Sequence, residues 1–264
     1  MKVVTDVGQL PSGCAFVPTM GALHAGHASL MSIAKEHSEN VVVSIFVNPL
    51  QFESSDDLAK YPRTPDADIE LAAMHGVTHV WLPPHAEIYP KDHPVLTAGP
   101  ISQLYEGKSR PGHFDGVVTV VRRFFDLLKP STAIFGEKDF QQLKLVEEIA
   151  GDVKIIRAPI IREADGLAMS SRNTRLTPEG RAAAAVISQA LFASETESEL
   201  RKALASEPLL TVDYADLIDE ESFLPAGGDT AHTRAIVAGW INGVRLIDNR
   251  PVSYTHLRAH ETLM

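Results

Sequence analysis

Two short apolar runs near the start of the chain have the pattern of buried parallel strands. Cys14–Pro18 (CAFVP) and Val41–Val47 (VVVSIFV) are rich in apolar and β-branched residues and are bounded by turn residues. Between them, the apolar positions of His27–His37 recur at helical spacing. The pattern predicts a strand, a turn, a helix and a second strand, which together form one βαβ unit.

The same alternation continues as far as residue 158. Further helices are predicted over Asp66–Met74, Phe114–Leu128 and Phe140–Ala150, and further strands over Thr78–Leu82, Thr132–Phe135 and Val153–Ala158. Helices that alternate with buried strands imply a parallel sheet covered by helices on both faces. We therefore predict an α/β fold built on a Rossmann-like, doubly wound parallel sheet.

The pattern changes at Arg162–Asn173, a polar segment that contains glycine. We place a domain boundary there, with a first domain of residues 1–163 and a smaller second domain of residues 164–249. The second domain has helical patterns at Pro178–Ala193 and in a polar stretch after it, and strand patterns at Val212–Ile218, Thr233–Trp240 and Val244–Ile247. It is predicted to be a small α+β domain.

The last stretch, Arg250–Met264, has neither helical nor strand periodicity. Its string SYTHLRAHET resembles translated read-through of a cloning or sequencing adapter. We therefore predict that residues 250–264 are a non-native tail and exclude them from the fold. Resequencing the source gene tests this prediction.

Composition narrows the class of protein. Of the 264 residues, 44% are hydrophobic and 22% are charged, as in an ordinary globular enzyme. A formal net charge of -10 argues against a general nucleic-acid binder, because such a surface repels phosphate backbones. Any phosphate that the protein binds should then lie in a local pocket.

The cysteine content and the hydropathy of the chain indicate its compartment. The single cysteine, Cys14, excludes an intramolecular disulfide, fits a reducing cytosol and is predicted to be a small buried apolar residue. No stretch approaches the roughly 20 apolar residues of a membrane span, and the N-terminus lacks a basic region followed by an apolar segment. We expect a cytoplasmic protein that binds neither nucleic acid nor membrane.

The first chemical motif is PTMGALHAGH, which begins at Pro18 directly after buried strand residues. It places His24 and His27 at the opening of a helix, where free N–H groups and the positive dipole end attract anions. Two imidazoles three residues apart lie on one face, so we predict that they bind a triphosphate, with His27 as the main donor. The alternatives are a surface turn with two solvated histidines, and a metal pair, for which no third ligand stands nearby.

Two more motifs follow predicted strands. In FVNPLQF, Asn48 and Gln51 offer uncharged donors and acceptors that suit the hydroxyl and carboxylate groups of a small polar acid. In FGEKDFQQL, Gly136 allows close approach to a ligand, Lys138 is a cation for phosphate, and Asp139 can accept from ribose hydroxyls or help to hold magnesium. Simple turn formers and an ordinary helix start are the alternatives.

The remaining polar segments are MSSRN, at Met169–Asn173, and the stretch around Arg110. Ser170, Ser171 and Arg172 place two hydroxyls and a guanidinium at the start of the second domain, where we predict that they close over a triphosphate and exclude water. Arg110 is the cation expected beside the acid. A polar linker and a helix cap are the alternatives.

Together these motifs resemble a known family. HAGH after a strand resembles the HxGH signature of the nucleotidylyltransferase superfamily, whose members attack the α-phosphate of ATP, and PTMGALHAGH in full is similar to the pantothenate synthetase (pantoate:β-alanine ligase) family. The resemblance implies that D-pantoate attacks magnesium-bound ATP to form pantoyl-adenylate and pyrophosphate, and that β-alanine then forms pantothenate and releases AMP. It also implies a homodimer and a C-terminal domain that acts as a lid.

By resemblance, three residues are expected to act in catalysis: His24, His27 and Lys138. The residues expected to bind ATP are Met20, Gly21, Ala22, Leu23, His24, Ala25, Gly26, His27, Gly136, Glu137, Lys138, Asp139, Ile161, Met169, Ser170, Ser171 and Arg172. Those expected to bind pantoate and β-alanine are Asn48, Gln51, Arg110 and Gln142. No dedicated metal site is expected.

Two other functions remain open from the sequence. One is a different nucleotidylyltransferase of the superfamily, which leaves the nucleotidyl group on a phosphate. The other is a non-catalytic nucleotide-binding module, against which the complete set of motif residues argues, because a pure binder needs fewer of them. One departure from the family pattern is the segment from Gln142 to Pro159, which is a few residues shorter.

Overall fold

A computed structural model describes residues 1–52, 55–227 and 230–252, and the chain divides into two compact units. The first unit comprises Met1–Ile161 and Met169–Ser171, and the second comprises Arg162–Ala168 and the chain from Arg172 onward. The chain therefore passes between the units after residues 161, 168 and 171, whereas the sequence predicted one boundary after residue 163.

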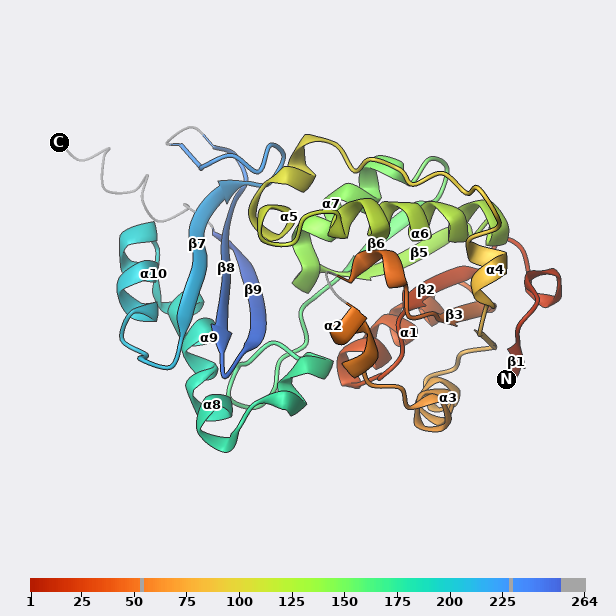
Figure 1. The fold of residues 1–264 in the computed structure, drawn as a ribbon, viewed down its shortest axis with the longest axis horizontal. Helices are drawn as coiled ribbons and strands as arrows, with labels where there is room; N and C mark the ends of the chain where they lie inside the picture. The colour runs from red at the N-terminus through yellow and green to blue at the C-terminus, as the bar shows by residue number, and fades with distance from the viewer. Residues whose placement is uncertain (53–54, 228–229, 253–264) are drawn as a thin grey trace. The chain divides into compact units, whose positions relative to one another are not determined.

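Among the described residues, the first unit is built on a six-stranded parallel sheet in the order β1-β4-β3-β2-β5-β6 (Figure 1). Its strands are β1 (Lys2–Val4), β2 (Ala15–Thr19), β3 (Val41–Ile45), β4 (His79–Trp81), β5 (Thr132–Gly136) and β6 (Lys154–Ala158). The predicted α/β class is confirmed. Strand β1 was not predicted, because three residues, two of them exposed, are too short for a periodic signal.

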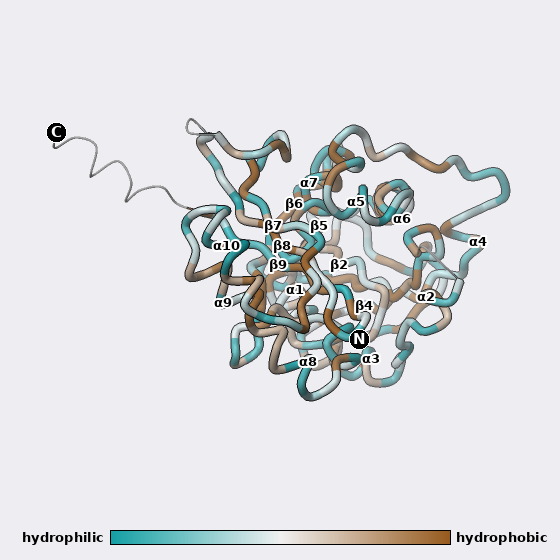
Figure 2. Tube along the Cα trace, turned by 60° about the vertical axis from the view of Figure 1, so that its left-hand side comes forward, coloured by the Kyte–Doolittle hydropathy of each residue, from teal (hydrophilic) through white to brown (hydrophobic). Residues whose placement is uncertain are grey.

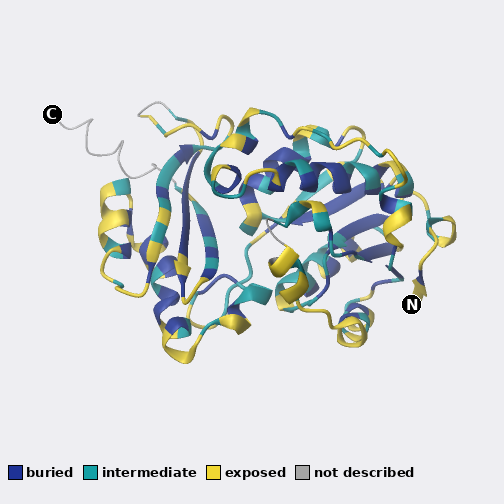
Figure 3. Ribbon diagram, in the orientation of Figure 1, coloured by how far each residue is buried: buried dark blue, intermediate teal, exposed yellow. Residues whose placement is uncertain are grey.

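Helices cover both faces of this sheet. The main ones are α1 (Ala25–His37), α3 (Pro65–Met74), α6 (His113–Leu128) and α7 (Phe140–Ile149). Helices α1 and α3 lie on one face and α6 and α7 on the other, over the largely buried central strands β2, β3 and β5 (Figure 3). Ala15 and Val17 of β2 share a core with Met31 of α1, while Phe16 packs edge-on against Phe124 of α6, with ring centroids 5.6 Å apart. Successive side chains of β2 point to opposite faces, so this strand contributes to the cores on both sides of the sheet.

Short helical elements were not predicted, because they are too short to complete a hydrophobic period. They are the helices α2 (Ser55–Lys60), α4 (His85–Ile88) and α5 (Tyr105–Ser109), and the 3-10 turns η1 (Val7–Gln9), η2 (Pro49–Gln51), η3 (Pro100–Gln103), η4 (Glu137–Asp139) and η5 (Ser171–Arg175). Three of them, η2, η4 and η5, fall on the predicted chemical motifs.

The strand order reverses beside β2. The chain runs outward from β2 through β3 to β4, and then crosses back to β5 on the other side of β2. Because α1 follows β2 on one face and α7 follows β5 on the other, the loops after these strands separate at their carboxyl ends. Open α/β sheets bind ligands at such a switch point. The HxGH motif and the FGEKDFQQL motif both begin there.

The segment from Gln142 to Pro159 completes the sheet despite its shortness. Helix α7 ends at Ile149, Gly151 turns the chain with φ +60, and β6 pairs with all five residues of β5. The edge of the sheet beside the switch point is therefore intact.

The second unit contains, within the described residues, a three-stranded antiparallel sheet in the order β7-β8-β9. Its elements are α8 (Pro178–Ala183), α9 (Ala185–Ala193), α10 (Glu197–Leu204), β7 (Thr211–Asp219), β8 (Thr233–Ile241) and β9 (Val244–Val252). The predicted α+β character is confirmed, although the helix predicted over Pro178–Ala193 is divided at Ala184. Helix α10 is the predicted polar helix and is largely hydrophilic in Figure 2.

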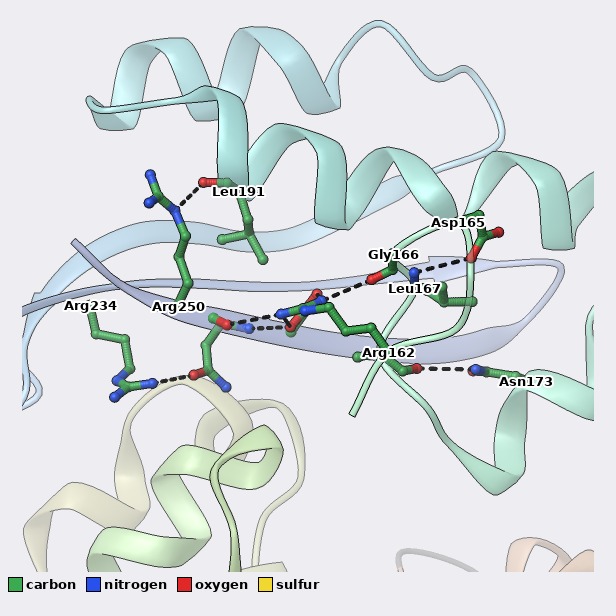
Figure 4. A network of polar contacts seen from close by, with 11 residues as sticks. Arg162, Asp165, Gly166, Leu167, Asn173, Leu191, Arg234 and Arg250 are labelled. Carbon is green, nitrogen blue, oxygen red and sulfur yellow. Dashed lines mark hydrogen bonds and ion pairs between the residues drawn. The ribbon is translucent and has the colours of Figure 1, made fainter. Parts of the chain in front are cut away.

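Strand β9 is longer than the sequence predicted. It runs to Val252, and the guanidinium of Arg250 donates to the main-chain oxygen of Leu191 in α9 (Figure 4). It also donates to the main-chain oxygen of Ser194, the residue after α9. Excluding residues 250–252 from the fold was therefore wrong, because the unpaired carbonyls of a helix C-terminus attract a cation. The rest of the predicted tail, residues 253–264, lies outside the described residues.

The boundary segment Arg162–Ala168 is anchored within the second unit (Figure 4). Arg162 donates to both carboxylate oxygens of the buried Asp248, at 2.5 and 2.9 Å. Arg181 of α8 pairs with the two carboxylates of the segment. These ion pairs explain why a segment with the composition of a linker belongs to a compact unit.

Two expectations from composition concern the core and the membrane. Cys14 is fully buried, as predicted, and burial raises the pKa of its thiol to about 12. In the part of the chain that the structure describes, every helix is too short or too polar to cross a membrane.

Candidate active site

The helix start after β2 holds two imidazoles in a defined orientation. His24 is the N-cap of α1, and its Nδ1 accepts the N–H of Gly26 at 3.1 Å, while Nδ1 of His27 accepts the N–H of His24 at 3.3 Å. This reciprocal capping pattern uses Nδ1 of both rings as an acceptor. In a neutral imidazole the proton then lies on Nε2, so each ring carries an N–H donor on its other side.

The surroundings keep His27 neutral. Burial, and then repulsion by His24 whenever its ring is protonated and by Lys138, lower the pKa of His27 to about 3, against an opposing rise caused by Asp139. Among the described residues, no acceptor pairs with Nε2 of His27. A neutral, desolvated imidazole with an open N–H suits an anion that gains charge during a reaction.

The same electrostatic contacts connect the first and third motifs. Lys138 and Asp139 lie in the turn between β5 and α7, and their charges act on His27 of α1. Nζ of Lys138 is 4.0 Å from Oδ2 of Asp139, with the two side chains 20% and 51% exposed. A Cβ added to Gly136 would lie 3.9 Å from Leu30 of α1. Imidazole donors and a cation thus gather at the switch point.

Gly26 lets the ring of His24 fold back over its own helix. A Cβ at Gly26 would lie 2.9 Å from Cε1 of His24 and 3.7 Å from Cβ of Met169. The N–H of Met169 in turn donates to the main-chain oxygen of Ile161 at 2.9 Å. Two residues far along the chain are therefore held beside the HxGH helix start.

The other residues predicted for ATP are placed as follows. Met20, Ser170 and Ser171 are half-buried in the first unit, as is Glu137, and Ala25 is exposed in the first turn of α1. Arg172 is half-buried and belongs to the second unit.

A buried carboxylate shapes the loop that precedes His24. Oδ2 of Asp68 accepts the N–H of Ala22 at 3.0 Å, and its Oδ1 accepts the N–H of Leu23 at 2.8 Å and the hydroxyl of Thr64 at 3.0 Å. Ala22 has φ 51 and Gly21 has φ 80, so the loop is left-handed at two successive residues. The N–H groups of Ala22 and Leu23, both predicted to line the ATP site, therefore point to Asp68.

The acid motif is built around Asn48, which is 1% exposed. Its Nδ2 donates to Oε1 of Gln51 and to the main-chain oxygen of Gly116, both at 3.0 Å, and its Oδ1 accepts from the hydroxyl of Tyr89 at 2.7 Å and the N–H of Leu50 at 3.3 Å. Both donors and both acceptor positions of the Asn48 side chain are thus occupied by protein. The Nε2 of Gln51, by contrast, has no partner in residues 1–52, 55–227 and 230–252.

Two neighbouring glutamines on α7 have different surroundings. Gln141 is buried: its Oε1 accepts the N–H of Glu106 at 3.0 Å, and its Nε2 donates to the main-chain oxygens of Ile101 and Leu104 at 2.7 and 2.8 Å. Gln142 is half-buried, and its amide has no hydrogen-bond partner in the described chain. Gln141 therefore fixes η3 and α5, and Gln142 is the glutamine available to a ligand.

Sequence comparison decides which reaction this site belongs to. A family profile described as Pantoate-beta-alanine ligase matches residues 2–251. The chain belongs to this family. Among curated relatives, the pantothenate synthetase of Acidothermus cellulolyticus is 47% identical over 258 residues, which covers 90% of this chain and 85% of that protein. The predicted enzyme class, an ATP-dependent ligase, is confirmed.

Solved structures of the ligase family share the fold. The pantothenate synthetase of Thermus thermophilus superposes with a TM-score of 0.91 and 41% identity, covering 96% of this chain and 99% of that chain. The pantoate-beta-alanine ligase of Francisella tularensis, solved with beta-gamma ATP and beta-alanine, gives a TM-score of 0.80 and 35% identity over 95% of this chain and 97% of that chain.

Four residues of this ligase were missed by sequence reasoning: Asp68, Tyr89, His113 and Gly116. Asp68 carried a weak signal, since it stands four residues before the buried Ala72 and so on the core face of α3. Tyr89 follows the unpredicted α4, and burial raises the pKa of its phenol. His113 and Gly116 carried no chemical signal of their own, since Gly116 falls inside the predicted helix Phe114–Leu128 and His113 directly precedes it.

No cluster of three His, Cys, Asp or Glu side chains with the grouping of a metal site occurs among the described residues. The predicted HxGH imidazoles are instead engaged through Nδ1 with the main chain.

Proposed function

We propose that this chain condenses D-pantoate with β-alanine, using ATP, to form pantothenate, AMP and pyrophosphate through a pantoyl-adenylate. The observation that carries the proposal is the neutral His27, which keeps an N–H donor on Nε2 at the switch point of the sheet. The charge of Lys138 acts on the same imidazole and lowers its pKa. Membership of the ligase family supplies the substrates. The Francisella relative solved with beta-gamma ATP and beta-alanine supports two of them.

In the first step, the pantoate carboxylate attacks the α-phosphate and the bond to pyrophosphate breaks. Negative charge grows on the phosphate oxygens and on the leaving group. His27 and His24 donate to these oxygens from Nε2, and Lys138 adds a full positive charge. No protein nucleophile is needed, so catalysis rests on positioning and electrostatics.

In the second step, the amine of β-alanine attacks the acyl carbon, AMP leaves and the nitrogen loses a proton. We assign the open amides of Gln51 and Gln142 to the hydroxyl and carboxylate oxygens of pantoate, because amides can both donate and accept. Asn48 and Arg110 act beside Gln51, since both donate to it: Arg110 Nη2 lies 3.3 Å from its main-chain oxygen.

The remaining ATP contacts are assigned by residue type. Ile161 and Met169, held beside Gly26, offer apolar surface to the adenine. Ser170, Ser171 and Arg172 supply hydroxyl and guanidinium donors for the triphosphate. We keep the prediction that the second unit acts as a lid.

Magnesium enters as part of the MgATP substrate, and Asp139 is the carboxylate that we assign to it, because hard cations prefer oxygen ligands and half of this side chain is exposed. We also propose a homodimer in the cytoplasm, in line with the family resemblance. Sedimentation of the purified chain tests the assembly state.

The function is tested by incubating the purified chain with ATP, magnesium and D-pantoate, with and without β-alanine, and following AMP and pyrophosphate by chromatography. We expect AMP only when both acid and amine are present. Nucleotidyl transfer to a phosphate acceptor, without need of the amine, would instead indicate another member of the superfamily. Binding of ATP with no product would indicate a non-catalytic module.

The roles of His27 and Lys138 are tested by His27→Ala and Lys138→Ala. Each should lower kcat/KM about 100-fold or more, as expected for the loss of one preorganised donor, worth ~2.7 kcal/mol. His37→Ala in the last turn of α1 and Lys154→Ala on β6, both exposed, are matched controls. A loss of less than tenfold for either site variant would reject its role.

A further inference from the structure

The turn that carries Gln51 sits directly against the backbone of α6. A Cβ added to Gly116 would lie 2.4 Å from the main-chain oxygen of Leu50 and 2.8 Å from the N of Gln51. Both distances are shorter than any side chain tolerates, so only glycine allows this approach. The first turns of α6 therefore pack directly against the residues of η2.

The main-chain oxygen of Gln51 accepts hydrogen bonds from two side chains, one just before α6 and one at its first residue. Nδ1 of His113 lies 2.8 Å from it, and Nη2 of Arg110 lies 3.3 Å from it. Nη1 of Arg110 is also 3.1 Å from Nε2 of His113. Because the guanidinium can only donate, Nε2 must accept and Nδ1 must carry the proton that is donated to Gln51.

The side chain of Gln51 is fixed from a second direction. Asn48 donates to its Oε1 at 3.0 Å and is itself tied to α6 through the main-chain oxygen of Gly116. Since the amide oxygen is committed to Asn48, the NH2 group of Gln51 is turned away from Asn48 as a donor. Main chain and side chain are thus both set by contacts with α6.

We propose that His113 is a positioning residue for the acid substrate: it acts through the main-chain oxygen of Gln51 and does not touch the substrate. His113 is only 8% exposed, which fits a residue that works through its neighbours. The inference rests on the proposed function, in which the amide of Gln51 binds pantoate. If the donation is lost, Gln51 is no longer held in place and pantoate binding weakens, while the ATP site on α1 and α7 is unchanged.

Three substitutions separate this role from simple packing. His113→Asn keeps an N–H where Nδ1 lies, His113→Gln moves the amide to the position of Nε2, and His113→Phe keeps the ring without any donor. We expect KM for D-pantoate to rise at least tenfold in the Phe and Gln variants and less than threefold in the Asn variant. KM for ATP should stay within twofold of the wild type in all of them. His37→Phe, on the exposed end of α1, is the matched control.

A double-mutant cycle with Gln51→Ala completes the test. In the Gln51→Ala background, the Gln and Phe variants of His113 should cause no further rise in KM for pantoate, because both changes remove one interaction. Additive effects would overturn the inference, as would an Asn variant as impaired as the Phe variant, or KM values for ATP and pantoate that rise together. An inactive wild-type chain would refute the proposed function and this inference with it, whereas an active wild type with unchanged His113 variants refutes the inference alone.

Discussion

At the scale of single residues, the hydrogen bond made by one imidazole nitrogen decides what the other can do. In His24 and His27, Nδ1 accepts from the main chain of α1, so Nε2 is the donor. In His113 the arrangement is reversed, because Nε2 accepts from Arg110 and Nδ1 donates to a carbonyl. The same residue type therefore turns Nε2–H outward at a helix start in one motif and anchors a turn through Nδ1–H in another.

Asp68 is the residue whose replacement most directly tests the loop before His24. Asp68→Asn leaves one acceptor for the N–H groups of Ala22 and Leu23 and turns an NH2 group toward the other. A lost hydrogen bond to a buried charged group costs about 1.5 to 3 kcal/mol, so kcat/KM for ATP should fall at least about tenfold.

The control for this change is Asp66→Asn, an exposed acid in the same first turn of α3. Steady-state kinetics with varied ATP should give wild-type values for that variant. Unchanged ATP kinetics in Asp68→Asn would mean that the loop keeps its shape without the carboxylate.

At the scale of elements, the residues of the candidate site lie at the ends of strands and the starts of helices and not in their middles. The motifs PTMGALHAGH, FVNPLQF and FGEKDFQQL lie at the ends of β2, β3 and β5. The start of α6 packs against the turn after β3. The hairpin Arg162–Ala168 has no regular structure beyond one bridge between Arg162 and Ala168, yet it is fixed by charges at its tip. Ion pairs thus replace the apolar face that a longer element would bury.

The pH dependence of this hairpin follows from Asp165. A hydrogen bond from Arg181 lowers the pKa of Asp165 below its usual range. A carboxyl whose pKa is depressed by folding stabilises the native state fully above its unfolded pKa of about 4, and the effect is lost as the pH falls through the folded value. Its side chain is 39% exposed, so solvent screening limits the effect to under about 1 kcal/mol.

We therefore expect Asp165→Asn to lower the urea midpoint of unfolding slightly at pH 7, with the difference from wild type shrinking and then vanishing as the pH falls below about 4. The exposed Glu195→Gln in the same unit, measured at pH 7, is the control for the loss of one surface charge. A difference between Asp165→Asn and wild type that grows toward low pH would contradict the sign of the argument.

At the scale of the whole molecule, the chain forms two units and each contains one of the two tryptophans. Trp81 is fully buried in β4 of the first unit, and Trp240 of β8 in the second unit is 38% exposed. Among the described residues Nε1 of Trp81 has no hydrogen-bond partner, so Trp81→Phe removes no such bond. In that background, Trp240 fluorescence reports on the second unit alone.

The end of β9 gives a prediction for the whole chain. A chain ending at Val252 should melt within about 1 °C of the full chain, in line with the prediction of a non-native tail. A chain ending at Asn249 lacks the Arg250 bonds to α9 and three pairs of the β8–β9 ladder. Loss of a charged hydrogen bond of about 1.5 to 3 kcal/mol should lower the melting temperature by at least about 3 °C. Equal melting of the two shortened chains would show that Arg250 contributes nothing.

By itself, the sequence determined the alternating fold, the strand-end motifs, the ligase reaction and the burial of Cys14. These features are local: hydrophobic period, turn residues and short motifs are all written within about ten residues of chain. Only the tertiary structure decided that Asn48 is engaged entirely by protein, that Asp68 takes the loop N–H groups, that His113 holds Gln51 and that Arg250 caps α9. The last three contacts join residues 45, 62 and 59 positions apart, and no periodic pattern records a hydrogen bond made across such a separation.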